Sequence, residues 1–138
     1  MNTNDKFEVS KQRMVEENEA QYGKDARGLY GDGIVDASNA KLMGLTIEQH
    51  NRVQELSDLI NKSLKIGCEQ GDPSSQLAQE VCALHKEWLG YFWINYSKEA
   101  HLSLAQMYVE DPSFNEYYEK VGVGCAEFLR DALTVYCQ

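Results

Sequence analysis

The chain has 138 residues and carries 13 Lys and Arg against 22 Asp and Glu, a formal net charge of -9. This length suits one domain with one core, and the charge disfavours nucleic acid, anionic membranes and strongly acidic ligands as partners. With no apolar run of about 18 residues and no signal peptide at its start, the sequence predicts a cytoplasmic domain whose easier partners are neutral or cationic small molecules and proteins.

The N-terminal third predicts a weakly ordered helical segment. Periodicity near 3.6 residues recurs along the whole chain, and strand-like alternation is almost absent, so the predicted class is all-α. A first helix with a thin apolar stripe is predicted from about Asp5 to Tyr22. Five glycines then punctuate the stretch from Gly23 to Gly44, where we expect at most short helical turns. Residues 1–45 are therefore predicted to be a conditional lid, and residues 46–138 a helical core.

The core begins with two well-marked helices. The sequence Thr46–Gln49 fits a capping box at the start of a long helix, and Gly71 fits its C-terminal stop. Asp72 is predicted to be the N-cap of the next helix, with Pro73 as its first residue. Apolar residues at helical spacing extend that second helix through Phe92.

Three further helices complete the core. The segment from Lys98 to Val109 is apolar nearly all round, which predicts a position at the centre of the bundle. Asp111 fits the N-cap of a short helix, and the last helix is predicted from about Gly122 to Tyr136. The sequence thus predicts a bundle of about five main helices.

Catalysis and metal binding find little support in the residue spacing. The histidines His50, His85 and His101 lie on separate predicted helices without a zinc-binding spacing. They are expected to be hydrogen-bonded histidines at packing edges, with a haem-binding globin relative as an alternative. No nucleophile elbow, phosphate-binding loop or nucleophile–base pair is evident. We therefore expect no enzyme activity, no metal and no cofactor.

The cysteines indicate a reducing environment. The chain has four cysteines, which are scattered without a C-x-x-C pair: Cys68, Cys82, Cys125 and Cys137. Disulfide and metal scaffolds are disfavoured by this spacing. We expect reduced thiols that pack as small hydrophobic groups, with a reactive thiol as the alternative.

The aromatic residues carry the strongest functional signal, because nine of the fourteen lie between Trp88 and Tyr118. Rings with phenol or indole groups suit a large, flat ligand, since they combine wide apolar contact with a few orienting hydrogen bonds. The alternative is that these rings only form the core. The predicted ligand-binding residues are Trp88, Tyr91, Phe92, Tyr96, His101, Ser103, Tyr108, Tyr117 and Tyr118. The small Ser103 either leaves room for a cleft or bonds back to the preceding turn.

Several motifs follow one another in a distinctive order: Glu17-x-Glu19-Ala20-x-Tyr22-Gly23, Gly71-Asp72-Pro73, Leu84-His85-x-x-Trp88-Leu89, Leu104-Ala105-x-Met107-Tyr108-x-x-Asp111-Pro112-x-Phe114-x-x-Tyr117-Tyr118, and Gly124-Cys125-Ala126-Glu127-Phe128-Leu129-x-x-Ala132-Leu133. Together they resemble the TipAS antibiotic-recognition domain, from about Val15 to the end of the chain.

The resemblance implies a globin-like helical fold with a ligand cleft. In the family this domain either follows a MerR-type DNA-binding domain in the same chain or forms a protein by itself. It binds thiopeptides and other bulky hydrophobic antibiotics. The N-terminal part of the domain closes over the ligand. Binding either switches on transcription or sequesters the drug. This sequence has no winged helix, so we expect no direct binding to nucleic acid. Its start at Met1 favours a stand-alone protein over the C-terminal part of a longer regulator.

Departures from the family pattern concern the ligand. The resemblance places the family's drug-capturing cysteine at Ser103, and a serine hydroxyl will not add to a dehydroalanine as a thiolate does. Tyr22, His50 and Ser113 also replace residues common in the family. The sequence therefore predicts reversible binding of a bulky antibiotic under an N-terminal lid. A helical protein-interaction or dimerisation module without a small ligand is the alternative.

Overall fold

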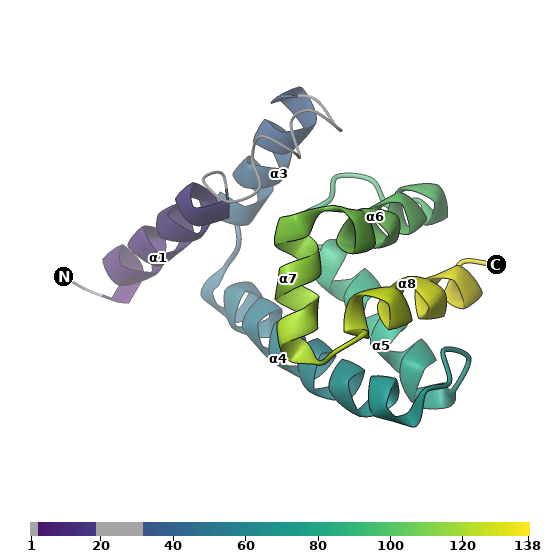
Figure 1. Ribbon diagram of the computed structural model, residues 1–138. Helices are drawn as coiled ribbons and strands as arrows, with labels where there is room; N and C mark the ends of the chain where they lie inside the picture. The colour runs from purple at the N-terminus through teal and green to yellow at the C-terminus, as the bar shows by residue number, and fades with distance from the viewer. Residues whose placement is uncertain (1–2, 19–31) are drawn as a thin grey trace.

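The computed structural model describes residues 3–18 and 32–138, and the regular structure in these ranges is entirely α-helical (Figure 1). The helices are α1 (Thr3–Asn18), α3 (Asp32–Met43), α4 (Ile47–Gln70), α5 (Gln76–Leu89), α6 (Lys98–Glu110), α7 (Pro112–Val121) and α8 (Cys125–Tyr136). The predicted all-α class is confirmed. The predicted end of the first helix at Tyr22, and Gly23, Gly28 and Gly31, lie outside the described residues. Within them, no helix has the length and apolar character needed to cross a membrane.

The helix α3 corrects the prediction of short turns between Gly23 and Gly44. Twelve consecutive residues are helical there, although a glycine inside a helix costs about 1 kcal/mol relative to alanine. Tertiary packing offsets that cost, because Leu42 is only 2% exposed and Leu45, just beyond the helix, is also buried. The composition showed the helix-breaking residues but not the surface on which the helix packs.

The long helix α4 follows its predicted signals closely. The Thr46 hydroxyl accepts a hydrogen bond from the Gln49 backbone N–H, and the Gln49 side chain accepts one from the Thr46 N–H. At the other end Gly71 adopts a φ of 80°, a left-handed conformation that glycine takes without strain. The predicted capping box and glycine stop are both confirmed.

The helix α5 begins later and ends earlier than predicted. Its N-cap is Ser75, whose hydroxyl accepts from the Ala78 N–H at 3.1 Å. Asp72 instead accepts hydrogen bonds from the backbone and side chain of Ser74, so its carboxylate stabilises a local turn. The helix stops at Leu89, and Phe92 belongs to the connection that follows.

The helix α6 corrects the expectation of a helix that is apolar nearly all round. His101, Leu104, Ala105 and Tyr108 form its buried face, while Ser103 is exposed. The helix therefore lies at the side of the bundle, packed against α7 and α8.

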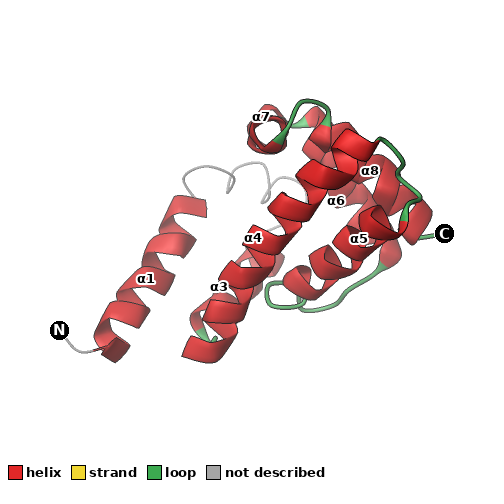
Figure 2. Cartoon of the chain, turned by 90° about the horizontal axis from the view of Figure 1, so that it is seen from below, coloured by secondary structure: helices red, strands yellow, loops and turns green. Residues whose placement is uncertain are grey.

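Two hydrophobic clusters organise the molecule. The larger one is formed by α4 to α8, with α8 packed on both α5 and α6. The smaller one contains Leu42, Leu45 and Val53, and Met14 and Val15 of α1 pack against it. In Figure 1 α1 and α3 lie beside the five-helix core, and in Figure 2 α1 again lies to one side of it. The smaller cluster is thus the apolar contact between the N-terminal helices and this core.

Candidate ligand-binding site

A cavity of about 380 Å³ opens between the N-terminal helix α1 and the five-helix core. Its walls come from α1, α4, α5, the connection after α5, α6 and α7. The lining residues are Met14, Val53, Gln54, Ser57, Ile60, Asn61, His85, Trp88, Leu89, Phe92, Trp93, Leu104, Tyr108, Phe114, Tyr117 and Tyr118. This volume lies within the range of small-molecule sites, about 300–1,000 Å³.

Aromatic rings form most of two walls of the cavity. On the α5 side, the rings of Trp88 and Phe92 have centroids 4.8 Å apart. On the α7 side, Tyr118 packs against Tyr108 with centroids 4.6 Å apart, and Tyr117 meets Tyr118 edge to face. Rings fixed by such contacts present broad apolar surfaces to a ligand with little further loss of entropy.

The α4 wall combines the apolar Val53 and Ile60 with uncharged polar side chains. Gln54, Ser57 and Asn61 recur at helical spacing and therefore share one face of α4. The Asn61 side-chain amide donates to the Tyr117 hydroxyl at 2.9 Å, which joins α4 to α7 beside the cavity. None of the described lining residues is Asp, Glu, Lys or Arg. The described wall thus offers hydrogen bonds without a fixed charge.

Below the cavity, four side chains form one buried chain of hydrogen bonds. Tyr108 Oη lies 3.2 Å from His85 Nε2, His85 Nδ1 lies 2.8 Å from His101 Nε2, and His101 Nδ1 lies 2.7 Å from Tyr96 Oη. Both imidazoles are at most 1% exposed. The chain of hydrogen bonds runs from the cavity wall at Tyr108, along the buried face of α6, to Tyr96 just before the start of this helix.

Burial keeps both imidazoles neutral. Loss of hydration, with the nearby His101, lowers the pKa of His85 to about 3. Loss of hydration, with the Lys86 charge, lowers the pKa of His101 to about 4. Every ring nitrogen of the pair is engaged with another side chain, so neither ring has a nitrogen left for a haem iron. Across residues 3–18 and 32–138, no three His, Cys, Asp or Glu side chains are grouped to hold a metal.

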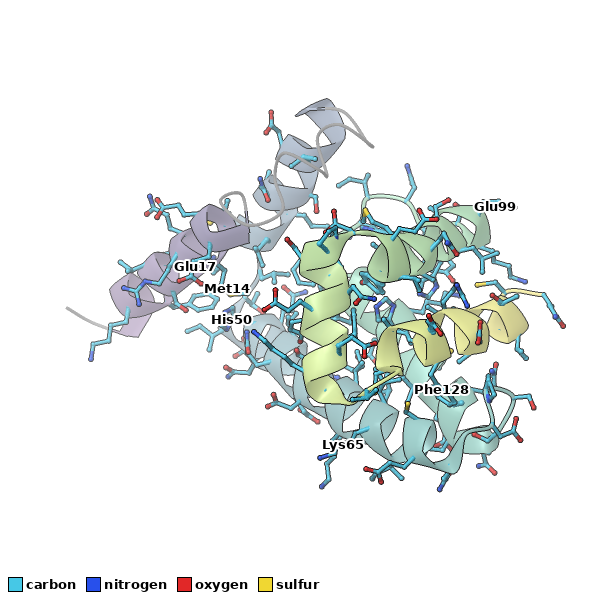
Figure 3. All side chains as sticks on the ribbon, in the orientation of Figure 1. Met14, Glu17, His50, Lys65, Glu99 and Phe128 are labelled. Atoms are coloured by element: carbon cyan, nitrogen blue, oxygen red, sulfur yellow. The ribbon has the colours of Figure 1, made fainter. Side chains whose placement is uncertain are left out.

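The helix α1 reaches the site through Met14, which lies next to His50 at the start of α4 (Figure 3). The Met14 sulfur is 3.2 Å from His50 Nε2. Burial and the nearby Lys11 charge lower the pKa of His50. Met14 is therefore the contribution of the described N-terminal helices to the cavity wall.

Polar side chains also attach the N-terminal helices to the core. The Lys11 ammonium is buried and donates to the carbonyls of Met43 and Leu45, which joins α1 to the end of α3. Lys41 donates to the Gly90 and Trp93 carbonyls, each at 2.7 Å. Ser38 donates to the Phe92 carbonyl at the same distance. The helix α3 thus holds the connection that carries Phe92 and Trp93.

The nine predicted site residues fall into two groups. The cavity wall contains five of them: Trp88, Phe92, Tyr108, Tyr117 and Tyr118. The other four lie elsewhere. Tyr91 packs on the smaller hydrophobic cluster, Tyr96 and His101 continue the buried chain away from the cavity, and Ser103 is exposed on α6.

Sequence reasoning did not select Met14, His85, Trp93, Phe114 or the polar face of α4. The spacing of Gln54, Ser57 and Asn61 was the available signal for that face, because these three uncharged polar residues recur at helical spacing. Met14 offered no comparable signal, since its place in the wall depends on how α1 docks.

The cysteines lie outside the cavity wall. Cys82, Cys125 and Cys137 are buried, and Cys68 is half-buried. Burial raises the pKa of Cys82 and that of Cys125 to about 12. A thiol that stays protonated is a poor nucleophile.

The chain is similar to curated transcriptional activators over most of its length. The chain is 23% identical over 137 residues to the HTH-type transcriptional activator mta of Bacillus subtilis (strain 168), which covers 99% of the chain and 53% of that protein. It is 26% identical over 117 residues to the HTH-type transcriptional activators TipA of Streptomyces coelicolor and Streptomyces lividans, covering 82% of the chain and 46% of each. The chain thus spans about half the length of these relatives. No solved structure matches significantly.

The family assignment rests on a match to a family model and not on these pairwise identities. The profile of the TipAS antibiotic-recognition domain matches residues 22–136, which include every described wall residue except Met14. The chain therefore belongs to the TipAS antibiotic-recognition domain family.

Proposed function

We propose that this domain binds a bulky, uncharged and largely apolar antibiotic of the thiopeptide type in the cavity between α1, α4, α5 and α7. The observation that carries the proposal is the aromatic cavity itself, found in a chain of an antibiotic-recognition family. Trp88, Phe92 and Phe114 supply apolar area, while Asn61 and Tyr117 supply hydrogen bonds to orient a ligand. The domain acts by binding and carries out no reaction.

The N-terminal helices act in this proposal as the lid. Met14 contributes to the cavity wall. Within the described residues, α1 and α3 are attached to the core by the smaller cluster, the Phe7–His50 ring contact and a few side-chain hydrogen bonds. A segment with few buried apolar contacts opens at a low free energy cost. A ligand larger than the cavity would enter by displacing α1 and would then be covered by it.

Binding is proposed to be reversible. No described cysteine lines the cavity, and a protonated, buried thiol will not add to an electrophilic drug. The relatives named as transcriptional activators suggest two settings for such binding. The domain either senses the drug for an attached MerR-type DNA-binding domain or sequesters the drug by itself, in both cases in the cytoplasm.

Fluorescence provides the direct test, because the chain's two tryptophans, Trp88 and Trp93, both line the cavity. Titration with a panel of thiopeptides and other bulky antibiotics should change the emission, and calorimetry should give the same affinity. Tyr117→Ala removes a wall residue and should weaken binding at least about tenfold. Tyr91→Ala is the matched control outside the wall and should change it little. Absence of both fluorescence and heat signals across the panel would refute the proposal.

A further inference from the structure

The end of α4 and the start of α8 lie against each other at a point where α4 has no side chain. Gly67 is buried in α4, and a Cβ atom at this position would lie 3.5 Å from the Phe128 ring of α8. Figure 3 labels Phe128 at this contact. Cys68 directly follows Gly67, and Cys125 precedes Phe128 by one helical turn. The close approach of the two helices therefore brings both cysteines to one junction.

The connection between α7 and α8 places the two thiols next to each other. The Cys68 S–H donates to the Val123 carbonyl oxygen, with the sulfur 3.7 Å from that oxygen. A Cβ atom at Gly122 would lie only 3.0 Å from Cys125 Sγ, so the absence of a side chain at Gly122 makes room for this thiol. The Cys68 and Cys125 side chains are hydrogen-bond partners. The two sulfur atoms are thus neighbours, as disulfide formation requires.

The two thiols differ in their access to solvent and in their affinity for a proton. Cys68 is half-buried, and its neighbour Val123 is 92% exposed, so a small solute can reach this edge of the junction. Cys125 is fully buried. Burial, and then the hydrogen bond to the Cys68 sulfur, raises the pKa of Cys125 to about 12. Cys68 is therefore the thiol that meets an oxidant, and Cys125 is a protonated thiol held behind it.

The other two cysteines lack such an entry. Cys82 and Cys137 are both buried. The Cys137 thiol is also engaged by a hydrogen bond with the Tyr96 hydroxyl. Of the four cysteines, the pair at the junction of α4 and α8 thus combines an accessible sulfur with a neighbouring thiol.

We propose that Cys68 and Cys125 form a redox pair, which a small hydroperoxide converts to a disulfide that ties the end of α4 to the start of α8. First, the Cys68 thiolate attacks the terminal peroxide oxygen and the O–O bond breaks, which leaves a sulfenic acid on Cys68. The departing oxygen takes up the proton that the Cys68 thiol had released. The Cys125 sulfur then attacks the Cys68 sulfur, the S–O bond breaks, and the Cys125 proton leaves with the hydroxyl group as water. The two electrons lost by the thiols reduce the peroxide.

The environment of Cys125 sets how fast this disulfide closes and how well it lasts. A thiol with a raised pKa attacks slowly, but its place beside the Cys68 sulfur makes the attack intramolecular and so favours it. The same raised pKa makes the Cys125 thiolate a poor leaving group, so the closed disulfide resists reduction. Neither sulfur lines the cavity. The inference therefore goes beyond the proposed function and does not depend on a bound drug.

Oxidation of the reduced 138-residue chain with hydrogen peroxide at neutral pH tests the inference. The treated protein is unfolded and alkylated, so that its intact mass counts the thiols that remain. Two of the four cysteines should escape alkylation, and a reductant should restore both. Proteolytic peptides should contain a link between Cys68 and Cys125. The midpoint of thermal unfolding should rise by about 5 °C or more, because the crosslink restricts the unfolded chain.

Matched variants assign the two steps. In Cys68→Ser, all three remaining cysteines should be alkylated, since the thiol that meets the oxidant is gone. In Cys125→Ser, oxidation should stop at a sulfenic acid on Cys68, which dimedone captures. Cys82→Ala removes a buried thiol away from the junction, and the link should form as in the wild type. The wild-type peptide map decides the matter even if Cys125→Ser fails to fold.

Three results would overturn the inference. The first is a link between Cys82 and Cys137 in place of the predicted one. The second is a sulfinic acid on Cys68 without any link. The third is full alkylation of all four cysteines after a peroxide treatment that oxidises a reference cysteine peptide. Antibiotic binding in the fluorescence titration would still stand after any of these results, so the two proposals fail separately.

Discussion

At the scale of single residues, two buried imidazoles make the stability of the domain depend on pH. The pKa of His85 is about 3 and that of His101 about 4 in the folded protein, below the ordinary value of 6.5. The unfolded chain therefore binds protons first as the pH falls. The two histidines make their full contribution to the free energy of unfolding above pH 6.5. As the pH falls from 6.5 toward 4, the free energy of unfolding decreases by up to about 1.4 kcal/mol per pH unit for each histidine.

Denaturant unfolding measured between neutral pH and about pH 5 checks this prediction, because few carboxylates titrate in that window. His50→Gln is the control, since His50 lies outside the buried chain and is only partly buried. In His50→Gln, the free energy of unfolding should keep most of its dependence on pH. A free energy of unfolding that stays constant over the window would show that the imidazoles are hydrated or paired with an anion.

Cysteine labelling at position 103 tests whether this position contacts a bound drug, as the resemblance to the family's drug-capturing cysteine implies. Ser103 is exposed on α6 and is not part of the cavity wall, whereas Ser57 is half-buried in it. In Ser103→Cys, an aromatic disulfide reagent should label the new thiol rapidly, and at the same rate with the best antibiotic of the panel bound. In Ser57→Cys, the bound antibiotic should slow labelling at least about tenfold, because a buried interface excludes the reagent. Protection of the thiol in Ser103→Cys would instead place the drug on the outer face of α6.

At the scale of elements, α3 controls the position of the connection after α5. Lys41→Met removes two charge-assisted hydrogen bonds to the Gly90 and Trp93 carbonyls, and should cost about 1–2 kcal/mol of stability. Hydrogen exchange of the amides of residues 90–93 should become faster, because the connection loses its attachment to α3. Lys62→Met, at an exposed position on α4, is the matched control and should leave both quantities unchanged. Unchanged exchange in Lys41→Met would mean that Ser38 and apolar packing hold the connection by themselves.

The same elements show what local sequence signals can and cannot establish. The capping box at Thr46, the glycine stop at Gly71 and the cap at Asp111 act within a few residues, and all three were predicted correctly. Between Asp72 and Ser75 two suitable caps compete, and the choice of Ser75 depends on the turn that Asp72 forms with Ser74. The helix α3 depends on its packing against the core, which no local pattern contains.

At the scale of the whole molecule, the cavity wall combines residues that are far apart in the sequence. The cluster of aromatic residues after Trp88 predicted where the apolar surface of a cavity would come from. The His85–His101 contact joins positions 16 residues apart and depends on how α5 and α6 cross. Met14 enters only because α1 docks on the core. The sequence thus indicated which segment would supply aromatic rings to the cavity wall, whereas the individual wall residues depend on the packing.

The contrast between a strongly acidic molecule and an uncharged cavity leads to a prediction about salt. The formal net charge is -9, yet the described wall contains no ionised side chain. Exposed charges beyond a Debye length, about 10 Å at 0.1 M salt, act weakly on a bound neutral ligand. The affinity for an uncharged antibiotic should therefore change less than about twofold between roughly 0.05 and 0.5 M sodium chloride.

Gln54→Glu supplies the comparison, because Gln54 lies in the α4 wall and the change adds a charge with almost no change in size. In this variant, a cationic derivative of the same antibiotic should bind several-fold more tightly at low salt, and the gain should vanish at high salt. The neutral parent compound should show no such gain, since it has no charge for the new carboxylate to attract. Isothermal titration at the two salt concentrations measures each affinity. On the wild-type protein, the affinity for the neutral antibiotic could instead fall about tenfold from low to high salt. That result would mean that an ionised group contacts the ligand. The cavity wall would then have to include a charged residue from outside the described ranges.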